Sequence, residues 1–254
     1  MAATSLGDAC VLITGASSGI GRACAEAFAA EGCRLVLAAR RRDRLEDLAT
    51  ALPVPTLPVE LDVRDRSAVD AAIGGLPPDW ADVDLLVNNA GLAVGFGPLP
   101  DNDPADWDRM IDTNVTGLLN VIHAVLPGML ARGRGHIVNI GSIAGRETYP
   151  NGAVYCASKA AVDRITAGLR MDVVGSGVKV SVIQPGLVET EFSMVRFGGD
   201  AERAETVYAG LDPLTGADIA DAVLWVVSRP ARVQVAEVVV LAGAQASATI
   251  VHRR

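Results

Sequence analysis

The chain has 254 residues, half of them apolar, and a formal net charge of −8. This length and composition suffice for one large α/β domain with a sizeable core. The acidic balance argues against a nucleic-acid partner, because phosphate binding needs a basic face. No apolar run approaches the ~20 residues of a membrane-spanning helix, and residues 1–7 carry no signal-peptide core. We therefore expect neither a nucleic-acid nor a membrane partner.

The cysteines and histidines indicate no metal centre. Cys10, Cys24, Cys33 and Cys156 form no CxxC pair, and the three histidines are scattered singly. Neither a zinc site nor a redox motif follows from this spacing. Free thiols are typical of a reducing compartment, so the sequence predicts a cytoplasmic protein.

The chain begins with a strand, a glycine turn and a helix. Residues 9–14 are a continuous apolar run, typical of a strand buried on both faces. The turn that follows spans residues 15–21, and a helical spacing of apolar residues starts at Ile20 and stops at Gly32. Glycines permit close approach of a ligand, and the free N–H groups of the helix start can bind a pyrophosphate. The G-x-x-x-G-x-G spacing differs from the G-x-G-x-x-G fingerprint, but this context predicts a nucleotide site rather than a structural turn.

The second strand, residues 33–39, ends in three arginines, Arg40 to Arg42. An acidic residue at this place would bind the ribose 2′-hydroxyl of NAD and repel a 2′-phosphate. Guanidinium groups suit a phosphate, so the sequence predicts NADP as the cofactor. The alternative is a solvated basic start to the next helix. Ser18, where some NADP enzymes carry a second basic residue, adds no support.

The next strands carry polar residues at their carboxyl ends. Residues 56–63 read as an edge strand because of Pro58, which fits the order 3-2-1-4-5-6, and Asp62 at its end is placed to meet the adenine. Strand four, residues 83–87, runs into Asn88 and Asn89. A long helix over residues 107–131 contains Asn114, whose amide needs partners among apolar neighbours. Strand five, residues 136–142, ends at Ser142 on the ligand side.

A helix over residues 151–174 carries Tyr155 and Lys159. Positions i and i+4 share one face of a helix, so the phenol and the ammonium stand side by side. A nearby cation favours phenolate and lowers the tyrosine pKa, which gives a proton donor and acceptor usable near neutral pH. Tyr-x-x-x-Lys alone is a weak signal, since an amphipathic helix with both residues at its rim is the common case.

The remaining elements complete one domain over residues 1–254. Strand six, residues 178–183, precedes Pro185 and Gly186, and a helix over residues 219–227 and a strand over residues 237–241 follow. Strand and helix alternate throughout, which predicts a doubly wound parallel sheet of about seven strands with helices on both faces. The polar insert at about residues 189–212, with Gly198 and Gly199, reads as a mobile substrate lid.

Several of these motifs together resemble the short-chain dehydrogenase/reductase family, with its Rossmann-type sheet. They are the turn at residues 14–21, Asn88-Asn89-Ala90-Gly91, Asn114, Ser142, Tyr155-x-x-x-Lys159 and Pro185-Gly186. The resemblance implies that Tyr155 is the general acid/base and that Ser142 hydrogen-bonds the substrate oxygen. It also implies that Lys159 holds the nicotinamide ribose and lowers the Tyr155 pKa, and that Asn114 positions a water in a proton relay.

The motifs also give a set of cofactor-binding positions, from the turn to the residues expected beside the nicotinamide. The predicted set is Gly15, Ser17, Ser18, Gly19, Ile20, Gly21, Arg40, Arg41, Asp62, Val63, Asn89, Ala90, Gly91, Tyr155, Lys159, Pro185, Gly186, Val188 and Thr190. The resemblance further implies a homotetramer assembled through the long helices that begin near Trp107 and Asn151.

One branch of the family is more similar than the rest. Residues 110–114, 125–129, 185–193 and 195–200 are similar to the NADP-dependent 3-hydroxy acid dehydrogenases, which act on serine, L-allo-threonine and short 3-hydroxy acids. The resemblance implies hydride exchange between such an alcohol and its carbonyl. Arg196 and Arg146 are the candidates to bind the substrate carboxylate. Alternatives are a broad or pathway-specific NADPH-dependent aldehyde/ketone reductase and, from another class, a nucleotide-sensing regulator without turnover.

Overall fold

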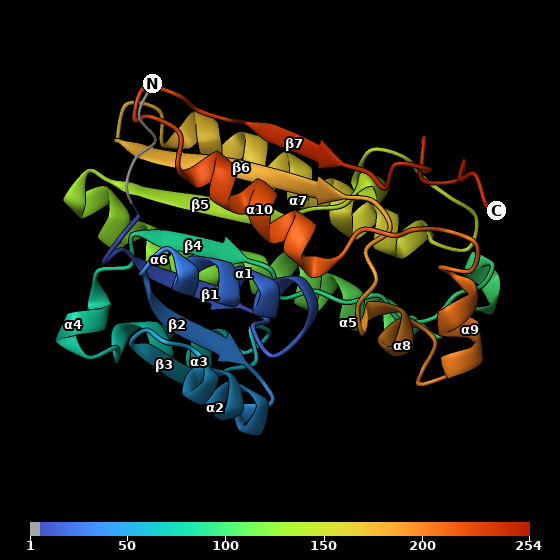
Figure 1. Cartoon of the computed structure of the whole chain (residues 1–254), viewed down its shortest axis with the longest axis horizontal. Helices are drawn as coiled ribbons and strands as arrows, with labels where there is room; N and C mark the ends of the chain where they lie inside the picture. The colour runs from blue at the N-terminus through green and yellow to red at the C-terminus, as the bar shows by residue number, and fades with distance from the viewer. Residues whose placement is uncertain (1–5) are drawn as a thin grey trace.

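The computed structural model describes residues 6–254. Within these residues the centre of the molecule is a sheet of seven parallel strands in the order β3-β2-β1-β4-β5-β6-β7 (Figure 1). The strands span Cys10–Thr14 (β1), Arg34–Ala39 (β2), Thr56–Glu60 (β3), Leu85–Asn88 (β4), Gly135–Ile140 (β5), Val178–Pro185 (β6) and Glu237–Val240 (β7). The predicted doubly wound sheet, with strand three at its edge, is confirmed.

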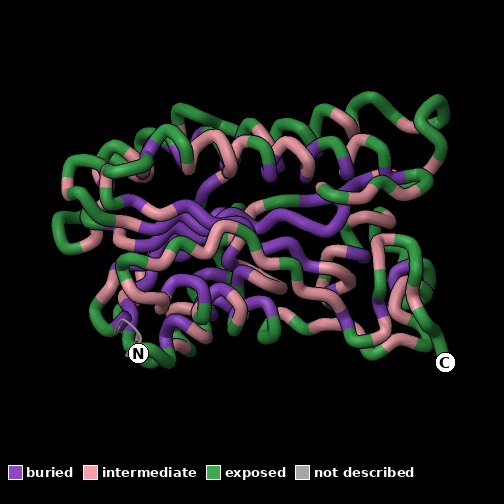
Figure 2. The backbone as a smooth tube through the Cα atoms, turned by 90° about the horizontal axis from the view of Figure 1, so that it is seen from above, coloured by how far each residue is buried: buried purple, intermediate pink, exposed green. Residues whose placement is uncertain are grey.

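Side chains of the central strands alternate between two apolar cores, one on each face of the sheet. In β1, Val11 and Ile13 join one core, while Cys10 and Leu12 join the other. Successive side chains of a strand point to opposite faces, so a strand covered on both sides must be apolar throughout. Figure 2 shows the buried sheet between more exposed layers of helix.

Six of the described helices cover the two faces. The first core includes buried residues of α1 (Gly19–Ala30), α2 (Arg42–Ala51) and α10 (Gly216–Val227). The second includes those of α3 (Arg66–Gly74), α6 (Leu118–Arg132) and α7 (Ala153–Asp172). Each helix presents an apolar stripe at helical spacing to the sheet, which is why these segments read as amphipathic.

The predicted long helix around Asn114 differs from expectation in its middle. Helix α5 (Pro104–Ile111) passes into a π-helical segment, Asp112–Gly117, before α6 begins. The continuous stretch Pro104–Arg132 is long and apolar enough to span a membrane by length and composition, contrary to the expectation from the sequence. Its apolar side packs in the second core, where Val121, Val125 and Met129 are buried. Core packing therefore accounts for its composition.

Short elements occur where the sequence predicts only loops. Helix α4 (Pro78–Ala81) has Pro78 at its first position, where proline suits a helix start. Helices α8 (Phe192–Arg196) and α9 (Ala201–Thr206) lie within the predicted lid. Val188 and Leu214 form an isolated bridge at the base of this segment.

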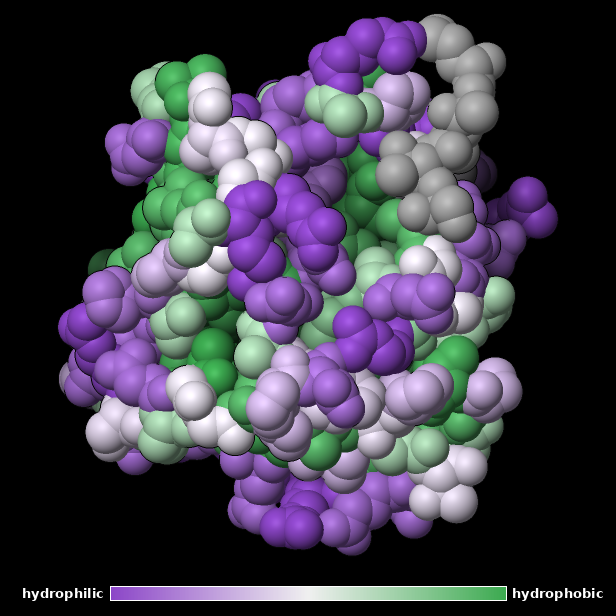
Figure 3. Space-filling view, turned by 90° about the vertical axis from the view of Figure 1, so that its left-hand side faces the viewer, coloured by the Kyte–Doolittle hydropathy of each residue, from purple (hydrophilic) through white to green (hydrophobic). Residues whose placement is uncertain are grey.

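All strands point toward one end of the molecule, where α8, α9 and the C-terminal tail lie (Figure 1). Figure 3 shows the opposite end, where hydrophilic and hydrophobic residues are mixed over the surface. Open α/β sheets bind ligands beyond the carboxyl ends of their strands. The lid and the tail therefore cover the end at which a site is expected.

We predict that Phe28→Ala destabilises the fold strongly. Phe28 is fully buried on α1 within the first core, and truncating a buried phenylalanine costs about 3–5 kcal/mol. Val174→Ala is the control, because Val174 is 83% exposed and should stay within about 0.5 kcal/mol of the wild type. Urea unfolding at one fixed protein concentration measures both. Equal midpoints for the two variants would contradict this account of the core.

Candidate active site

A cavity of about 650 Å³ opens at the carboxyl ends of the strands. Its walls come from the glycine turn after β1, the ends of β2, β5 and β6, the segment after β4, helix α7, the lid and the C-terminal tail. It thus contains the β1/β4 boundary, where the strand order reverses. That boundary is the usual binding crevice of such sheets.

The glycine turn needs its glycines for two different reasons. Gly15 and Gly19 have positive φ of +66° and +53°, a region that favours glycine. Gly21 has an ordinary φ, but a Cβ there would stand 2.5 Å from Asn89 Nδ2. Gly21 therefore permits close packing of α1 on the segment after β4, and it is absent from the cavity wall although the sequence places it in the cofactor set.

The other predicted cofactor-binding residues all reach the cavity. Its lining contains Gly15, Ser17, Ser18, Gly19, Ile20, Arg40, Arg41, Asp62, Val63, Asn89, Ala90, Gly91, Tyr155, Lys159, Pro185, Gly186, Val188 and Thr190. The structure thus brings together residues from both halves of the chain. Whether each contacts the cofactor stays a prediction.

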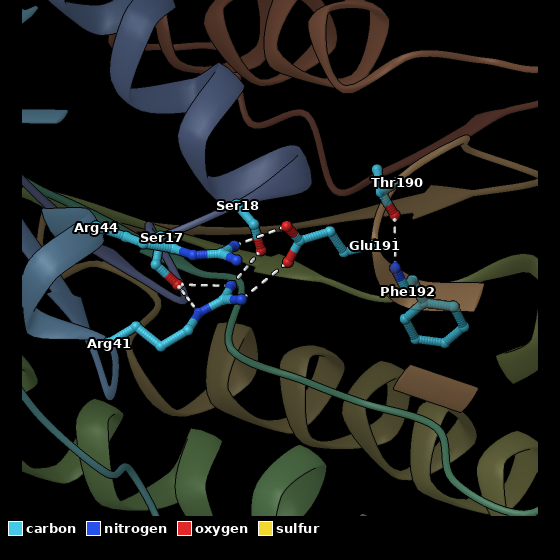
Figure 4. A network of polar contacts seen from close by, with 7 residues as sticks. All are labelled: Ser17, Ser18, Arg41, Arg44, Thr190, Glu191 and Phe192. Carbon is cyan, nitrogen blue, oxygen red and sulfur yellow. Dashed lines mark hydrogen bonds and ion pairs between the residues drawn. The ribbon is translucent and has the colours of Figure 1, made fainter. Parts of the chain in front are cut away.

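Arg41 lies at the centre of a polar network at one end of the cavity (Figure 4). Its Nε and Nη2 donate to Ser17 Oγ at 3.2 and 3.0 Å, and Nη2 also donates to Ser18 Oγ at 2.8 Å. Ser18 therefore does contribute here, by orienting Arg41, contrary to the expectation that it adds nothing. The remaining nitrogen, Nη1, pairs with Glu191 at 2.9 Å, and Arg44 Nη1 binds the same carboxylate at 2.6 Å.

Tyr155 projects from α7 into the cavity beside Ser142. Gly141 and Ile143, on either side of Ser142, line the cavity, while the buried Ser142 hydroxyl accepts from the Ala144 main-chain nitrogen at 3.1 Å and is among the groups that act on the Tyr155 phenol. Burial raises the pKa of Tyr155, while the Ser142 hydrogen bond and the Arg196 charge lower it. The sequence predicts that Lys159 lowers this pKa, but the cation among its main causes is Arg196. In this arrangement the phenol is held in its protonated form, as a donor.

Lys159 is buried one turn further along α7. Its Nζ donates to the Ile140 carbonyl at 2.9 Å, and burial lowers its pKa to about 8, opposed by the charge of Asp163. The ammonium is thus directed at the end of β5 rather than at the tyrosine. Burying a charged ammonium away from water costs free energy. Such perturbed ionisable groups are common at functional sites.

Asn114 lies in the π-helical segment, and its side chain hydrogen-bonds two other parts of the chain. Its side-chain amide exchanges two hydrogen bonds of 2.8 Å with the main chain of Leu92, and its Nδ2 also donates to Ser158 Oγ at 3.0 Å. The expected need for partners is therefore met by the segment after β4 and by α7. The amide holds the cavity wall together, and the water relay implied by the resemblance stays a prediction.

Arg196 is the last residue of α8, and its guanidinium group is surrounded by aromatic rings. Its guanidinium carbon lies 4.6 Å from the Phe96 ring centre, 5.2 Å from Tyr149 and 5.9 Å from Tyr155. Within residues 6–254 its buried Nε has no hydrogen-bond partner. Cation–π contacts hold the plane of the group while an N–H remains for an anionic ligand. Arg146 is not at this cavity, because it binds Gln184 at 3.0 Å and lies near Glu237.

Sequence reasoning missed part of the site. Glu191, Phe96, Tyr149 and Phe192 line the cavity, and Phe192 packs 5.5 Å from the Tyr155 ring. The tail also contributes, because Arg253 donates to the carbonyls of the lid residues Val207 and Ala209. Glu191 and Phe192 lie in the stretch 185–193 that resembles the 3-hydroxy acid dehydrogenases, but its spacing assigned them no role. A glutamate opposite the arginines becomes visible only when residues 150 positions apart are brought together.

Comparison with known proteins agrees with this geometry. Residues 9–199 match the family described as short chain dehydrogenase. The chain belongs to the short-chain dehydrogenase family. Its parallel strand order agrees with this assignment, and the roles of Ser142, Tyr155 and Lys159 stay predictions.

Three relatives show the range of similarity. The chain is 46% identical over 245 residues to an NADP-dependent 3-hydroxy acid dehydrogenase of Salmonella typhi, covering 96% of this chain and 99% of that protein. It is 49% identical over 227 residues to a sulfoacetaldehyde reductase of Chromohalobacter salexigens, covering 88% and 90%. The closed form of a serine dehydrogenase complexed with NADP⁺ is 43% identical, with a TM-score of 0.92 over 96% of this chain and 99% of that one.

We predict that burial of the Lys159 ammonium gives the fold a pH dependence. The pKa of about 8 lies below the 10.5 of an exposed lysine. The penalty for burying the charge is therefore complete below pH 8, and it disappears as the pH rises to 10.5 and both states become neutral. Relative to Lys159→Met, the wild type should gain about 3 kcal/mol over that interval. Urea unfolding of both proteins from pH 7.5 to 10.5 measures this, and parallel curves would refute it.

Proposed function

We propose that this protein is an NADP-dependent oxidoreductase that interconverts an alcohol and its carbonyl by hydride transfer, with short 3-hydroxy acids such as serine or L-allo-threonine as substrates. The observation that carries the proposal is the cavity shared by the Tyr155 phenol and by Arg196, whose buried Nε has no hydrogen-bond partner within residues 6–254. A proton donor and an anion-binding group thus lie within one small space.

The residues present fit NADP. Gly15 and Gly19, with positive φ, form the tight turn before α1, and the free N–H groups at the start of α1 can bind a pyrophosphate. Arg41 offers a guanidinium held in place by two serine hydroxyls, which suits a 2′-phosphate. A similar protein has been solved with NADP⁺. When bound, the nicotinamide supplies the hydride acceptor or donor of the reaction.

The side chains of the chain itself supply orientation and proton transfer. Ser142 donates a hydrogen bond to the substrate oxygen, and Tyr155 gives its proton to that oxygen in reduction or accepts it in oxidation. The buried Lys159 lies one turn away to bind a ribose hydroxyl. Lid residues Phe192 and Arg196 exclude water from the reacting end of the cavity.

Arg196 is placed to bind the carboxylate of a 3-hydroxy acid. A carboxylate can accept from its Nε, and the low polarity of the surrounding rings strengthens such a charge-assisted bond. Arg146, the other arginine considered from the sequence, lies at a separate cavity beside Asp163. Arg196 is therefore the carboxylate-binding residue of this proposal.

A second candidate function uses the same site. A sulfonate carries the same charge and the same kind of oxygen acceptors as a carboxylate, so a small sulfonated aldehyde would also suit Arg196. The 49% identity with a sulfoacetaldehyde reductase favours this form of the pathway-specific reductase over other aldehydes and ketones. A regulator without turnover is disfavoured, because the intact proton-transfer set would then serve no purpose.

We further propose a cytoplasmic homotetramer. The four cysteines are free and buried, as in proteins of a reducing compartment. Helix α6 exposes Leu119 and Leu130, each 42% exposed, and an assembly through the long helices would cover them. Static light scattering should give four times the chain mass. A purely monomeric protein would contradict the assembly.

We predict that Arg196→Met raises KM for L-serine and 3-hydroxybutyrate by about tenfold or more, because a charge-assisted hydrogen bond of roughly 1.5–3 kcal/mol is lost. KM for an uncharged secondary alcohol should change far less. NADP⁺ reduction at 340 nm measures both, with NAD⁺ in parallel. Arg203→Met is the matched control, since Arg203 is also a lid arginine over an aromatic ring but lies outside the cavity lining.

Equal loss for charged and uncharged substrates would remove Arg196 from carboxylate binding. Turnover of sulfoacetaldehyde with NADPH, and none of the hydroxy acids, would select the second candidate and leave the catalytic residues in place. Turnover with NAD⁺ alone would overturn the cofactor.

A further inference from the structure

The carboxylate of Glu191 lies between the guanidinium groups of Arg41 and Arg44, a pair called the arginine fork, at the end of the cavity where the adenosine of the cofactor is expected. Its two oxygens bind Arg41 Nη1 at 2.9 Å and Arg44 Nη1 at 2.6 Å (Figure 4). The two serine hydroxyls take the other nitrogens of Arg41. Glu191 therefore accepts from Nη1, the one Arg41 nitrogen that does not bind the serines of the glycine turn. The same carboxylate also binds Arg44, so it brings the two guanidinium groups together.

Glu191 reaches this place from the lid. It directly precedes α8, and its neighbour Thr190 packs against the glycine turn, since a Cβ at Gly19 would lie 3.2 Å from Thr190 Cβ. The lid thus begins at the same turn that holds Arg41. Glu191 lies close enough to act on any group bound by the arginines.

A 2′-phosphate would need the same donors. It carries more negative charge than a carboxylate and seeks the same bidentate contacts with guanidinium groups. A phosphate would compete with Glu191 for the N–H groups of Arg41 Nη1 and Arg44 Nη1, and two anions side by side repel each other. Arg44 and Arg41, in that order, also lower the pKa of Glu191 and so keep it ionised.

We propose that Glu191 is a cofactor-specificity residue, which competes with the 2′-phosphate for Arg41 and Arg44 and must leave them when that phosphate binds. The inference rests on the NADP dependence proposed above. A nucleotide without a 2′-phosphate leaves the Glu191 ion pairs intact. Glu191 therefore weakens the binding of NADP and reduces the preference of the protein for NADP over NAD. It also connects the binding of a phosphate to the position of the residues that begin the lid.

Calorimetric titration with adenosine 2′,5′-bisphosphate, and separately with 5′-AMP, tests the inference without turnover. Glu191→Gln should tighten binding of the bisphosphate by about two- to fivefold, the upper range for exposed ion pairs, and leave 5′-AMP unchanged. The gain should shrink at high salt. Glu189→Gln is the matched control, because it removes the same charge two positions away, where the side chain is exposed and outside the arginine network.

Arg41→Met supplies the second arm. If Glu191 acts partly through this arginine, Glu191→Gln should tighten the bisphosphate less when Arg41 is absent, because only the Arg44 pair then remains. Equal affinity of the wild type and Glu191→Gln, or weaker binding by the variant, would overturn the inference. A wild type that binds the two nucleotides equally would instead refute the proposed NADP preference, so the two failures are distinguishable.

Discussion

The contact between the ends of β1 and β4 fixes the geometry of the cavity. Thr14 Oγ1 accepts from the main-chain nitrogens of Asn89 and Ala90, each at 3.0 Å. Asn89 Nδ2 returns hydrogen bonds to the carbonyls of Thr14 and Gly15. These bonds satisfy polar groups at the strand ends, where the sheet ladder stops. They also hold the glycine turn open at the point where the strand order reverses, and Gly21 is small because Asn89 lies against it.

A second set of bonds ties this frame to the catalytic helix. Asn114 lies in the π-helical segment, where the helix deviates from its usual hydrogen bonding, as is common at functional sites. It holds Leu92 on one side and Ser158 of α7 on the other. Lys159 then reaches the end of β5 through Ile140. Tyr155 on α7 and Ser142 after β5 are thus positioned through the segment after β4 and the end of β5, and their spacing depends on the sheet.

The sequence was sufficient for whatever depends on local pattern. Apolar runs predicted the strands, Pro58 predicted the sheet edge, and i,i+4 spacing placed Tyr155 near Lys159 on α7. The sequence pattern could not predict contacts between segments that are far apart in the chain. The direction of the Lys159 ammonium depends on β5, and the arginine that meets Glu191 is 150 residues away. Arg146 and Arg196 could not be separated from position alone, because only folding directs one to Gln184 and the other to the rings.

Helix α8 connects the two charged ends of the cavity. Glu191 precedes it at the arginine fork, and Arg196 ends it among the aromatic rings. Five helical residues rise only about 7–8 Å, so a movement of the whole turn, as distinct from a rotation of the Glu191 side chain, displaces both of its ends. Such a movement of Glu191 away from Arg41 would therefore displace Arg196 relative to Tyr155, whose pKa that guanidinium lowers. Under the functions proposed for Glu191 and Arg196, the phosphate site and the substrate site would therefore be connected through a single turn of helix.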